Sequence, residues 1–182
     1  CGGVIPRDDF WEHAVAAAYV ARRIAQTTFP GKEDELYTCG LPHDLGYLLI
    51  ERTSPMRLGM AVQMALETGK DIAEAERSLV GADHAAAVEW LLKKSGLPEE
   101  LIDAVAGHHS PSLEKLSWRT VVWAAARYAS ANGIGIFRTA STWNIAQDAL
   151  WQRFWELIAP LAAVDQDIYL ADLYAVLEKG RN

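Results

Sequence analysis

The amino-acid sequence predicts an all-helical fold. Its 182 residues contain no sustained alternation of apolar and polar side chains, which a half-buried strand would require. Alanine-rich stretches instead repeat apolar residues at helical spacing, and glycines or prolines end most of them. The length suits one domain with a substantial core, and a composition of 51% hydrophobic and 23% charged residues is ordinary for a globular protein.

The first predicted helix covers residues 9–24. Asp9 and Glu12 have the spacing of a capping box, and the apolar residues that follow share one face. The sequence Phe29-Pro30-Gly31 then ends this segment.

A second helical segment covers residues 33–50, with Pro42 in its interior. Proline lacks an amide hydrogen and clashes with the preceding helical turn. We therefore expect the chain to bend or to restart its helix at His43.

The middle of the chain continues as short helices. Asp71 and Glu74 form a second capping box, and Pro98 suits the first turn of a helix that ends at His108-His109. The other helices are predicted over residues 55–68, 72–80 and 83–95, with Gly69, Gly81 and Gly96 as stops.

A long apolar helix is predicted over residues 113–131, followed by a joint at Asn132-Gly133. Ser141 or Thr142 is expected to cap a further helix that ends at Ile158, and a last helix covers residues 166–179. The tail is rich in aromatic residues, and Trp151, Trp155 and Ile158 share one face, near Trp143 and Phe154. We expect this face to pack on the rest of the protein; the alternative is an anchor for a partner, including a homodimer.

Charge and cysteine content exclude several functions. A net charge of -7, from 17 basic and 24 acidic residues, argues against binding to nucleic acid or to anionic membranes. The two cysteines, Cys1 and Cys39, are too few for a disulfide framework, and no signal peptide or membrane-spanning apolar run is present in the sequence. We expect a soluble, cytoplasmic protein. Because the chain begins at Cys1 rather than methionine, we also expect it to be part of a longer polypeptide.

The five histidines indicate a metal site. Neutral imidazoles together with a carboxylate suit iron, manganese or zinc, and a pair of ions needs ligands from several helices. The alternative is a buried network of hydrogen bonds among the same groups. The candidate ligands are His13, His43, Asp44, His84, His108 and His109.

Several motifs around these residues resemble the HDOD family, the output-domain relatives of HD and HD-GYP phosphohydrolases. They are Phe10-Trp11-Glu12-His13, Cys39-Gly40-Leu41-Pro42-His43-Asp44-Leu45-Gly46, Glu76 with Gly81-Ala82-Asp83-His84, Gly96-Leu97-Pro98, and His108-His109-Ser110-Pro111. The resemblance implies an HD-domain-like helical bundle over residues 8–132, without the usual amino-terminal helices of the family, and a helical extension over residues 133–182 packed on it. Relatives of this kind often lie beside a receiver or other sensory domain.

The resemblance also implies a ligand set. The six candidate ligands occupy positions that bind one or two divalent metal ions in active HD-GYP relatives. Asp9 lies four residues before His13 on the same helical face, so it is either an additional carboxylate ligand or the N-cap of its helix.

Three departures from the catalytic pattern accompany this ligand set. Ala126 stands where the active enzymes carry a closing aspartate, and Tyr47 stands where HD-GYP enzymes carry a lysine that would hold substrate phosphate. No Gly-Tyr-Pro sequence follows His109. These changes remove a ligand and a cation but keep the imidazoles, so hydrolysis should suffer more than metal retention.

Three functions are therefore considered. The first is a non-catalytic signalling domain, with or without metal, that relays a signal to a partner protein. The alternative is a metal-dependent phosphohydrolase acting on a nucleotide or a cyclic dinucleotide. A di-iron redox or oxygen sensor is held in reserve.

Overall fold

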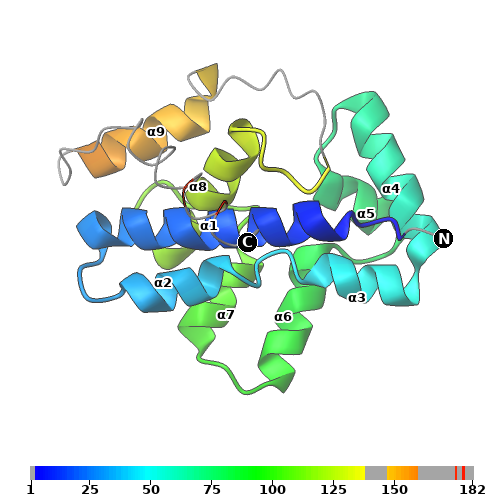
Figure 1. The fold of residues 1–182 in the computed structure, drawn as a ribbon, viewed down its shortest axis with the longest axis horizontal. Coiled ribbons are helices and arrows are strands. Elements are labelled where there is room, and N and C mark those ends of the chain that lie inside the picture. The colour runs from blue at the N-terminus through cyan, green and yellow to red at the C-terminus, as the bar shows by residue number, and fades with distance from the viewer. Residues whose placement is uncertain (1–2, 138–146, 160–174, 176–177, 179–182) are drawn as a thin grey trace.

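The computed structural model describes residues 3–137 and 147–159, together with residues 175 and 178 (Figure 1). Within these residues the protein consists of helices and loops without any strand, so the all-helical prediction is confirmed. The helices are α1 (Arg7–Thr28), α2 (Glu33–Gly40), α3 (Gly46–Thr53), α4 (Pro55–Thr68), α5 (Ile72–Leu79), α6 (His84–Lys94), α7 (Glu99–Ala106), α8 (Trp118–Ala131) and α9 (Ala149–Ile158).

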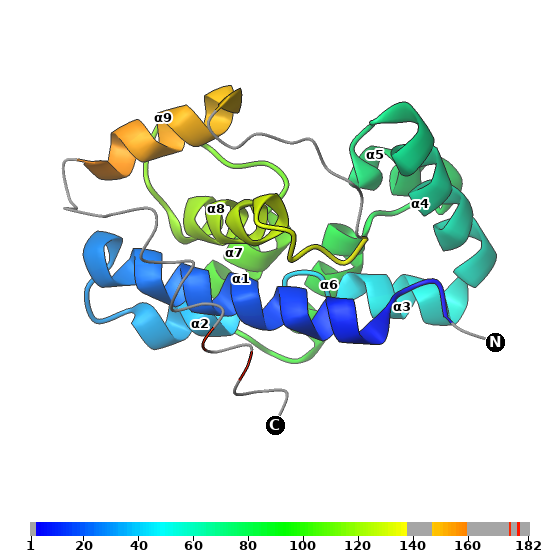
Figure 2. The ribbon, with the colours of Figure 1, turned by 45° about the horizontal axis from the view of Figure 1, so that its top comes forward.

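The long helix α1 organises the bundle. It crosses the molecule with α2 and α8 packed against it, while α6 packs against α3 and α7, and α4 and α5 pair at one end (Figures 1 and 2). None of the helices in the described part of the chain has both the length and the hydropathy that a membrane span needs.

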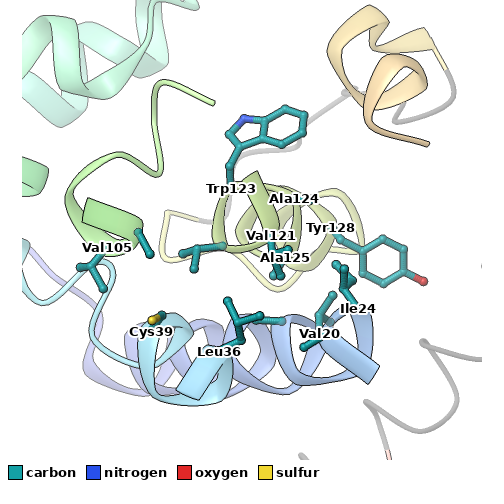
Figure 3. Packing of buried hydrophobic residues seen from close by; sticks show 14 of the residues in the cluster. Val20, Ile24, Leu36, Cys39, Val105, Val121, Trp123, Ala124, Ala125 and Tyr128 are labelled. Carbon is teal, nitrogen blue, oxygen red and sulfur yellow. The ribbon is translucent and has the colours of Figure 1, made fainter. Parts of the chain in front are cut away.

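The main core lies between α1, α2 and α8 (Figure 3). The face of α1 that enters it is built largely from alanines, which let neighbouring helices approach closely. The contact with α2 is closest at Gly40, where an added Cβ would lie 2.6 Å from the Cα of Ala18. Leu36 and Val121 fill the space between the helices and are fully buried.

Most predicted boundaries agree with the structure, because caps and prolines act locally. Helix α4 begins at Pro55 and ends before Gly69, which adopts a left-handed conformation with φ of 69°. Asp71 caps α5 by accepting a hydrogen bond from the amide of Ala73, and Asp83 caps α6 in the same manner.

The start of the first helix was predicted wrongly. Helix α1 begins at Arg7 with Pro6 at the N-cap, so Asp9 is a residue of the first turn and not the cap. Proline is compatible with a helix start, and Asp8 and Asp9 are both favourable at the positive end of the helix dipole. Likewise, Pro98 is the N-cap of α7 and not part of its first turn.

Two other helix starts also differ from the predictions. The predicted break at Pro42 is present, since the chain bends in a turn over residues 41–45, but its helix resumes at Gly46 and not at His43. Helix α8 begins at Trp118, because the hydroxyl of Ser117 accepts from the amide of Thr120 and so caps it; residues 113–117 form a loop.

Helix α9 packs on the bundle through its aromatic face. Trp151, Phe154 and Ile158 are buried in the main core, and the ring of Trp151 stacks on Tyr128 with centroids 5.8 Å apart. Asp148 caps this helix. Ser141, Thr142, Trp143 and nearly all of residues 166–179 lie outside the described residues. The division into domains at residues 8–132 and 133–182 stays a prediction.

Candidate metal centre

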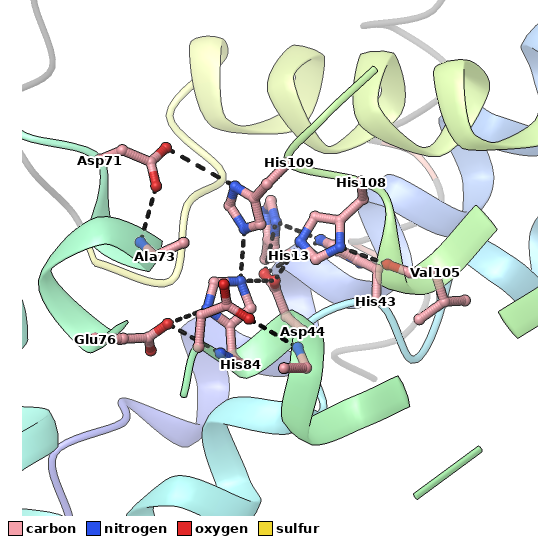
Figure 4. Close-up of polar contacts among 12 residues, drawn as sticks. His13, His43, Asp44, Asp71, Ala73, Glu76, His84, Val105, His108 and His109 are labelled. Carbon is pink, nitrogen blue, oxygen red and sulfur yellow. Dashed lines mark hydrogen bonds and ion pairs between the residues drawn. The ribbon is translucent and has the colours of Figure 1, made fainter. Parts of the chain in front are cut away.

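The structure brings all six candidate ligands together (Figure 4). They come from four places that are far apart in the sequence. His13 lies on α1, His43 and Asp44 lie in the turn between α2 and α3, His84 is the first residue of α6, and His108 and His109 follow α7.

A glycine controls how closely Asp44 approaches His84. Helix α3 begins at Gly46, and an added Cβ there would lie 1.8 Å from the carbonyl oxygen of His84. The turn that carries Asp44 is therefore held directly against the start of α6. The motif predicted from sequence contains Gly46, but this packing is visible only in the structure.

The carboxylate of Asp44 lies between two sets of imidazoles. Its Oδ1 is 3.4 Å from the Nε2 atoms of both His84 and His108. Its Oδ2 is 3.3 Å from Nε2 of His13 and 3.2 Å from Nε2 of His43. We call the group formed by Asp44 with His84, His108 and His109 the His84 side. The group formed by Asp44 with His13 and His43 is the His13 side.

Three imidazoles are oriented by backbone carbonyl groups. The distances from Nδ1 are 2.6 Å for His13 to Ile134 O, 2.7 Å for His43 to Gly40 O, and 2.6 Å for His108 to Val105 O. A carbonyl oxygen only accepts, so Nδ1 must carry the hydrogen in each ring. In the neutral rings the lone pair is then on Nε2, which faces Asp44.

His84 is oriented by a carboxylate. Oε2 of Glu76 accepts from His84 Nδ1 at 2.6 Å and from the backbone amide of His84 at 3.0 Å. Glu76 is fully buried on α5. Glu76 belongs to one of the motifs that resemble the HDOD family, but the sequence analysis assigned it no role. The signal that could have indicated its burial is its helical spacing from Ala73, which is buried on the same helix.

The environment shifts the pKa of several of these groups. Burial opposes ionisation of Asp44, but the electrostatic interaction with His43 and the polar contacts with His108 and His13 outweigh it and hold the carboxyl pKa well below its usual value. Burial also opposes protonation of His84, yet the contact with Glu76 leaves its pKa raised. Burial, with the nearby imidazoles, lowers the pKa of His109.

These residues fit a divalent metal ion. The ligand atoms of Asp44, His84, His108 and His109 all lie within 4.8 Å of one another, and so do those of His13, His43 and Asp44. His108 Nε2 is buried, and it has no hydrogen-bond partner among the residues that the structure describes. Such an orphaned lone pair, aimed at a carboxylate among imidazoles, is suited to iron, manganese or zinc.

A hydrogen-bond network is the alternative, and two contacts between imidazoles support it. Nε2 of His43 lies 3.2 Å from Nε2 of His13, and Nε2 of His109 lies 2.6 Å from Nε2 of His84. Because His84 Nδ1 donates to Glu76, a neutral His84 accepts at Nε2 and His109 donates to it. The two imidazoles thus satisfy each other in part, whereas His108 does not share in this contact.

A large cavity opens beside the cluster. Its volume is about 1200 Å³, and its lining includes His13, Asp44, Ala126 and the cationic residues Lys70 and Arg127. Lys70 pairs with Glu74, and Arg127 with Asp148. The cavity is large enough for a ligand of nucleotide size.

Tyr47, where the resemblance would place a lysine, is part of the wall of this cavity. Its ring stacks on His84 with centroids 3.9 Å apart and an interplanar angle of 17°. Burial and the charge of Asp44 raise the pKa of its phenol well above the usual value, so it is neutral. The wall therefore has a hydroxyl and an aromatic face at this position instead of a cation.

Asp9 and Asp71 are not part of either ligand group. Asp9 lies in the first turn of α1 and does not belong to the groups of atoms that could share an ion. Asp71 is exposed, and its Oδ2 lies 3.9 Å from Nδ1 of His109. The structure thus gathers the six predicted ligands and leaves out the additional carboxylate.

Comparison with known protein families identifies the family of this chain. The model of the HDOD domain family matches residues 2–111. No curated protein matches the chain.

Three crystal structures share the fold. An HDOD domain protein with unknown function from Geobacter sulfurreducens aligns with a TM-score of 0.71 at 22% identity, over 97% of this chain and 61% of that one. A candidate phosphohydrolase from Shewanella amazonensis aligns with a TM-score of 0.66 at 19% identity, over 92% of this chain and 59% of that one. A candidate signal transduction protein from Marinobacter aquaeolei aligns with a TM-score of 0.67 at 16% identity, over 93% and 36%. This chain therefore spans about three fifths or less of the length of each.

Proposed function

This chain belongs to the HDOD domain family, and from that premise we propose that it is a non-catalytic signalling domain that retains a degenerate metal site. In this proposal the site holds a divalent ion and ties together the elements that meet at Asp44. The domain passes a conformational or binding signal to a partner protein or to an attached sensory or receiver domain, in the cytoplasm. A second copy of the same chain is the further partner considered; because the aromatic face of α9 is buried in the main core, such a pair would use another surface.

The observation that carries the proposal is the lining of the cavity beside the cluster. Ala126, which stands where the resemblance places the closing aspartate of active enzymes, lines the same cavity as His13 and His43, and its methyl group offers no ligand atom. A hydrolytic metal site needs an ion that activates water, and a cationic side chain beside it strengthens the binding of substrate phosphate. Tyr47 offers a buried, neutral phenol instead.

The chain's own residues have a simpler role in a signalling domain. A bound ion would supply a strong cross-link among the elements that provide its ligands, and Asp44 would connect that cross-link to both groups of imidazoles. His13 and His43 donate their Nδ1 hydrogens to backbone carbonyls, so each imidazole is already oriented with Nε2 toward Asp44. Movement of any of these elements would therefore displace the others through their shared contacts with Asp44.

Metal-dependent phosphohydrolase activity is the second candidate, and one observation favours it. Lys70 and Arg127 line the same cavity as the ligand cluster, so two cations stand near a ligand that enters it. Both are already paired with carboxylates, Lys70 with Glu74 and Arg127 with Asp148. A related structure described as a candidate phosphohydrolase is consistent with this reading.

One experiment separates the two functions. The purified protein is analysed for iron, manganese and zinc, loaded with each ion, and assayed against bis(p-nitrophenyl) phosphate, nucleotides and a cyclic dinucleotide. The signalling function predicts bound metal without turnover above the metal-free protein. Turnover that depends on metal and is lost in Asp44→Asn would overturn the proposal in favour of the hydrolase. If the iron-loaded protein shows no reversible redox signal, the third hypothesis, a di-iron redox or oxygen sensor, is ruled out.

A further inference from the structure

We propose that the cluster binds a single divalent ion on the His84 side, and that Glu76 is the positioning residue that selects this side. This inference rests on the metal-bearing form of the proposed function. It assigns a role to a buried carboxylate that lies outside the ligand set, and it predicts a stoichiometry of one ion in place of two.

The number of donors differs between the two sides. The His84 side offers three imidazoles and Oδ1 of Asp44, whereas the His13 side offers two imidazoles and Oδ2 of the same carboxylate. Ala126 adds no donor to the cavity wall. An ion therefore finds four protein ligands on one side and three on the other.

Glu76 fixes the orientation of His84 more firmly than a carbonyl would. Its Oε2 accepts from both the Nδ1 and the backbone amide of His84, and it is 0% exposed. A carboxylate behind an imidazole holds the tautomer and makes the other nitrogen a better donor to a metal. In His84 that nitrogen is Nε2, 3.4 Å from Oδ1 of Asp44.

Glu76 also contributes charge. Its other oxygen, Oε1, is buried and has no hydrogen-bond partner in the part of the chain that the structure describes. Within that part, the charge of Glu76 is thus directed at His84 and at the start of α6, whose positive dipole end supports an anion. Buried charges are costly unless they are compensated, so Glu76 favours a cation close to His84.

The carboxyl groups also limit the number of ions. Asp44 and Glu76 are the two buried carboxyl groups that contact His84, and of these only Asp44 offers an oxygen to the His13 side. Asp71 approaches the same side, with Oδ2 3.9 Å from His109 Nδ1, but it is exposed and screened by water. A second ion on the His13 side would share the carboxylate of Asp44 and leave excess positive charge in a buried site, which is unfavourable.

The test measures stoichiometry and coordination. Metal-free protein is titrated with Co²⁺ and with Zn²⁺, ions per chain are counted by elemental analysis after gel filtration, and the visible absorption of bound Co²⁺ reports its ligands. Wild type should bind one ion. Glu76→Gln keeps the shape of the side chain and should weaken binding by about 10- to 100-fold, with an altered Co²⁺ spectrum. Glu74→Gln, on the exposed face of the same helix, is the matched control and should bind like wild type.

A second pair of variants locates the ion even if Glu76→Gln does not fold. His109→Ala removes a partly exposed ligand of the His84 side and should lose the ion, whereas His43→Ala on the His13 side should keep one ion per chain. Circular dichroism of each metal-free variant checks the fold. Two ions in wild type, an unchanged affinity in Glu76→Gln, or loss of the ion only in His43→Ala would each overturn the inference.

Failure of the inference and failure of the proposed function give different results. If wild type binds no Co²⁺ or Zn²⁺, the single-ion site is wrong, while a signalling domain without metal still stands. If the protein binds one ion and also hydrolyses a phosphodiester, the site is correct and the non-catalytic function is wrong.

Discussion

The two sides of Asp44 look alike in their ligands but differ in what lies behind them. On the His13 side, both imidazoles donate Nδ1 hydrogens to neutral backbone carbonyls, those of Ile134 and Gly40. On the His84 side, one imidazole donates to the carboxylate of Glu76. The charge behind a ligand can therefore distinguish two sites whose metal ligands are of the same kind.

Each side also depends on a glycine that lets two backbones approach. Gly46 lies against His84 on α6, and Gly40 lies against Ala18 on α1. An added Cβ would be 1.8 Å from its neighbour at Gly46 and 2.6 Å at Gly40, so the His84 side tolerates less change. Substitutions at these and nearby residues can therefore break the two sides separately.

The largest effect is expected for Gly46→Ala. The new methyl group would overlap a backbone carbonyl, which cannot rotate away, so we expect a loss of about 3 kcal/mol or more in the free energy of unfolding. Urea denaturation measures this loss. Gly59→Ala is the control: its Cβ would lie 3.7 Å from Val4 in an ordinary contact, and alanine should stabilise α4 by about 1 kcal/mol. Equal stability of the two variants would contradict the close approach at Gly46.

Asp44→Asn should have the next largest effect, because Asp44 contributes one oxygen to each side. The amide keeps the shape of the side chain but removes the charge that both sides share. We expect metal affinity to fall by more than about 100-fold, measured by competition with a chromophoric chelator. Binding that survives in Asp44→Asn would mean that the imidazoles hold the ion without this carboxylate.

Ala126→Asp is designed to make the two sides alike. Ala126 lines the cavity and stands where the resemblance places the closing aspartate of active enzymes, so we expect a carboxylate at this position to add a donor and a negative charge on the His13 side. We expect the number of bound ions to rise from one to two per chain, because the His13 side would then offer four ligands instead of three. Ala131→Asp lines the same cavity and serves as a positional control. A second ion in both variants would indicate a nonspecific effect of charge.

The smallest effect concerns the reactivity of Cys39, a buried thiol of the main core that directly precedes Gly40. Burial raises the pKa of its thiol to about 12. Below that pH the thiol is protonated, so at pH 8 it should not react with a thiol reagent until the protein unfolds. A Cys1→Ser variant leaves Cys39 as the one thiol of the chain, and absorbance follows its labelling. Rapid labelling of the folded protein would show that the contact between α1 and α2 opens readily.

The sequence predicted the parts of the structure that local chemistry decides. The spacing of alanines predicted helices, Pro42 predicted a break, and Gly69 and Asp71 predicted a helix end and a helix start. Errors occurred where more than one local signal was present. Pro6 competed with Asp9 for the start of α1, and Ser117 capped α8 after an apolar loop that resembled a helix.

Residue types alone determined the list of candidate ligands, because the chain has five histidines and each adjoins a motif of the HDOD family. Only the tertiary structure decided how those ligands are divided. The orientation of each imidazole depends on an acceptor distant in the chain, such as Ile134 for His13, 121 residues away. The pairing of Glu76 with His84 and the backbone approach at Gly46 likewise come from the packing of α5 and α3 against α6. Ligand identity is a property of single residues, whereas lone-pair direction and charge balance are properties of groups that meet only when the chain is folded.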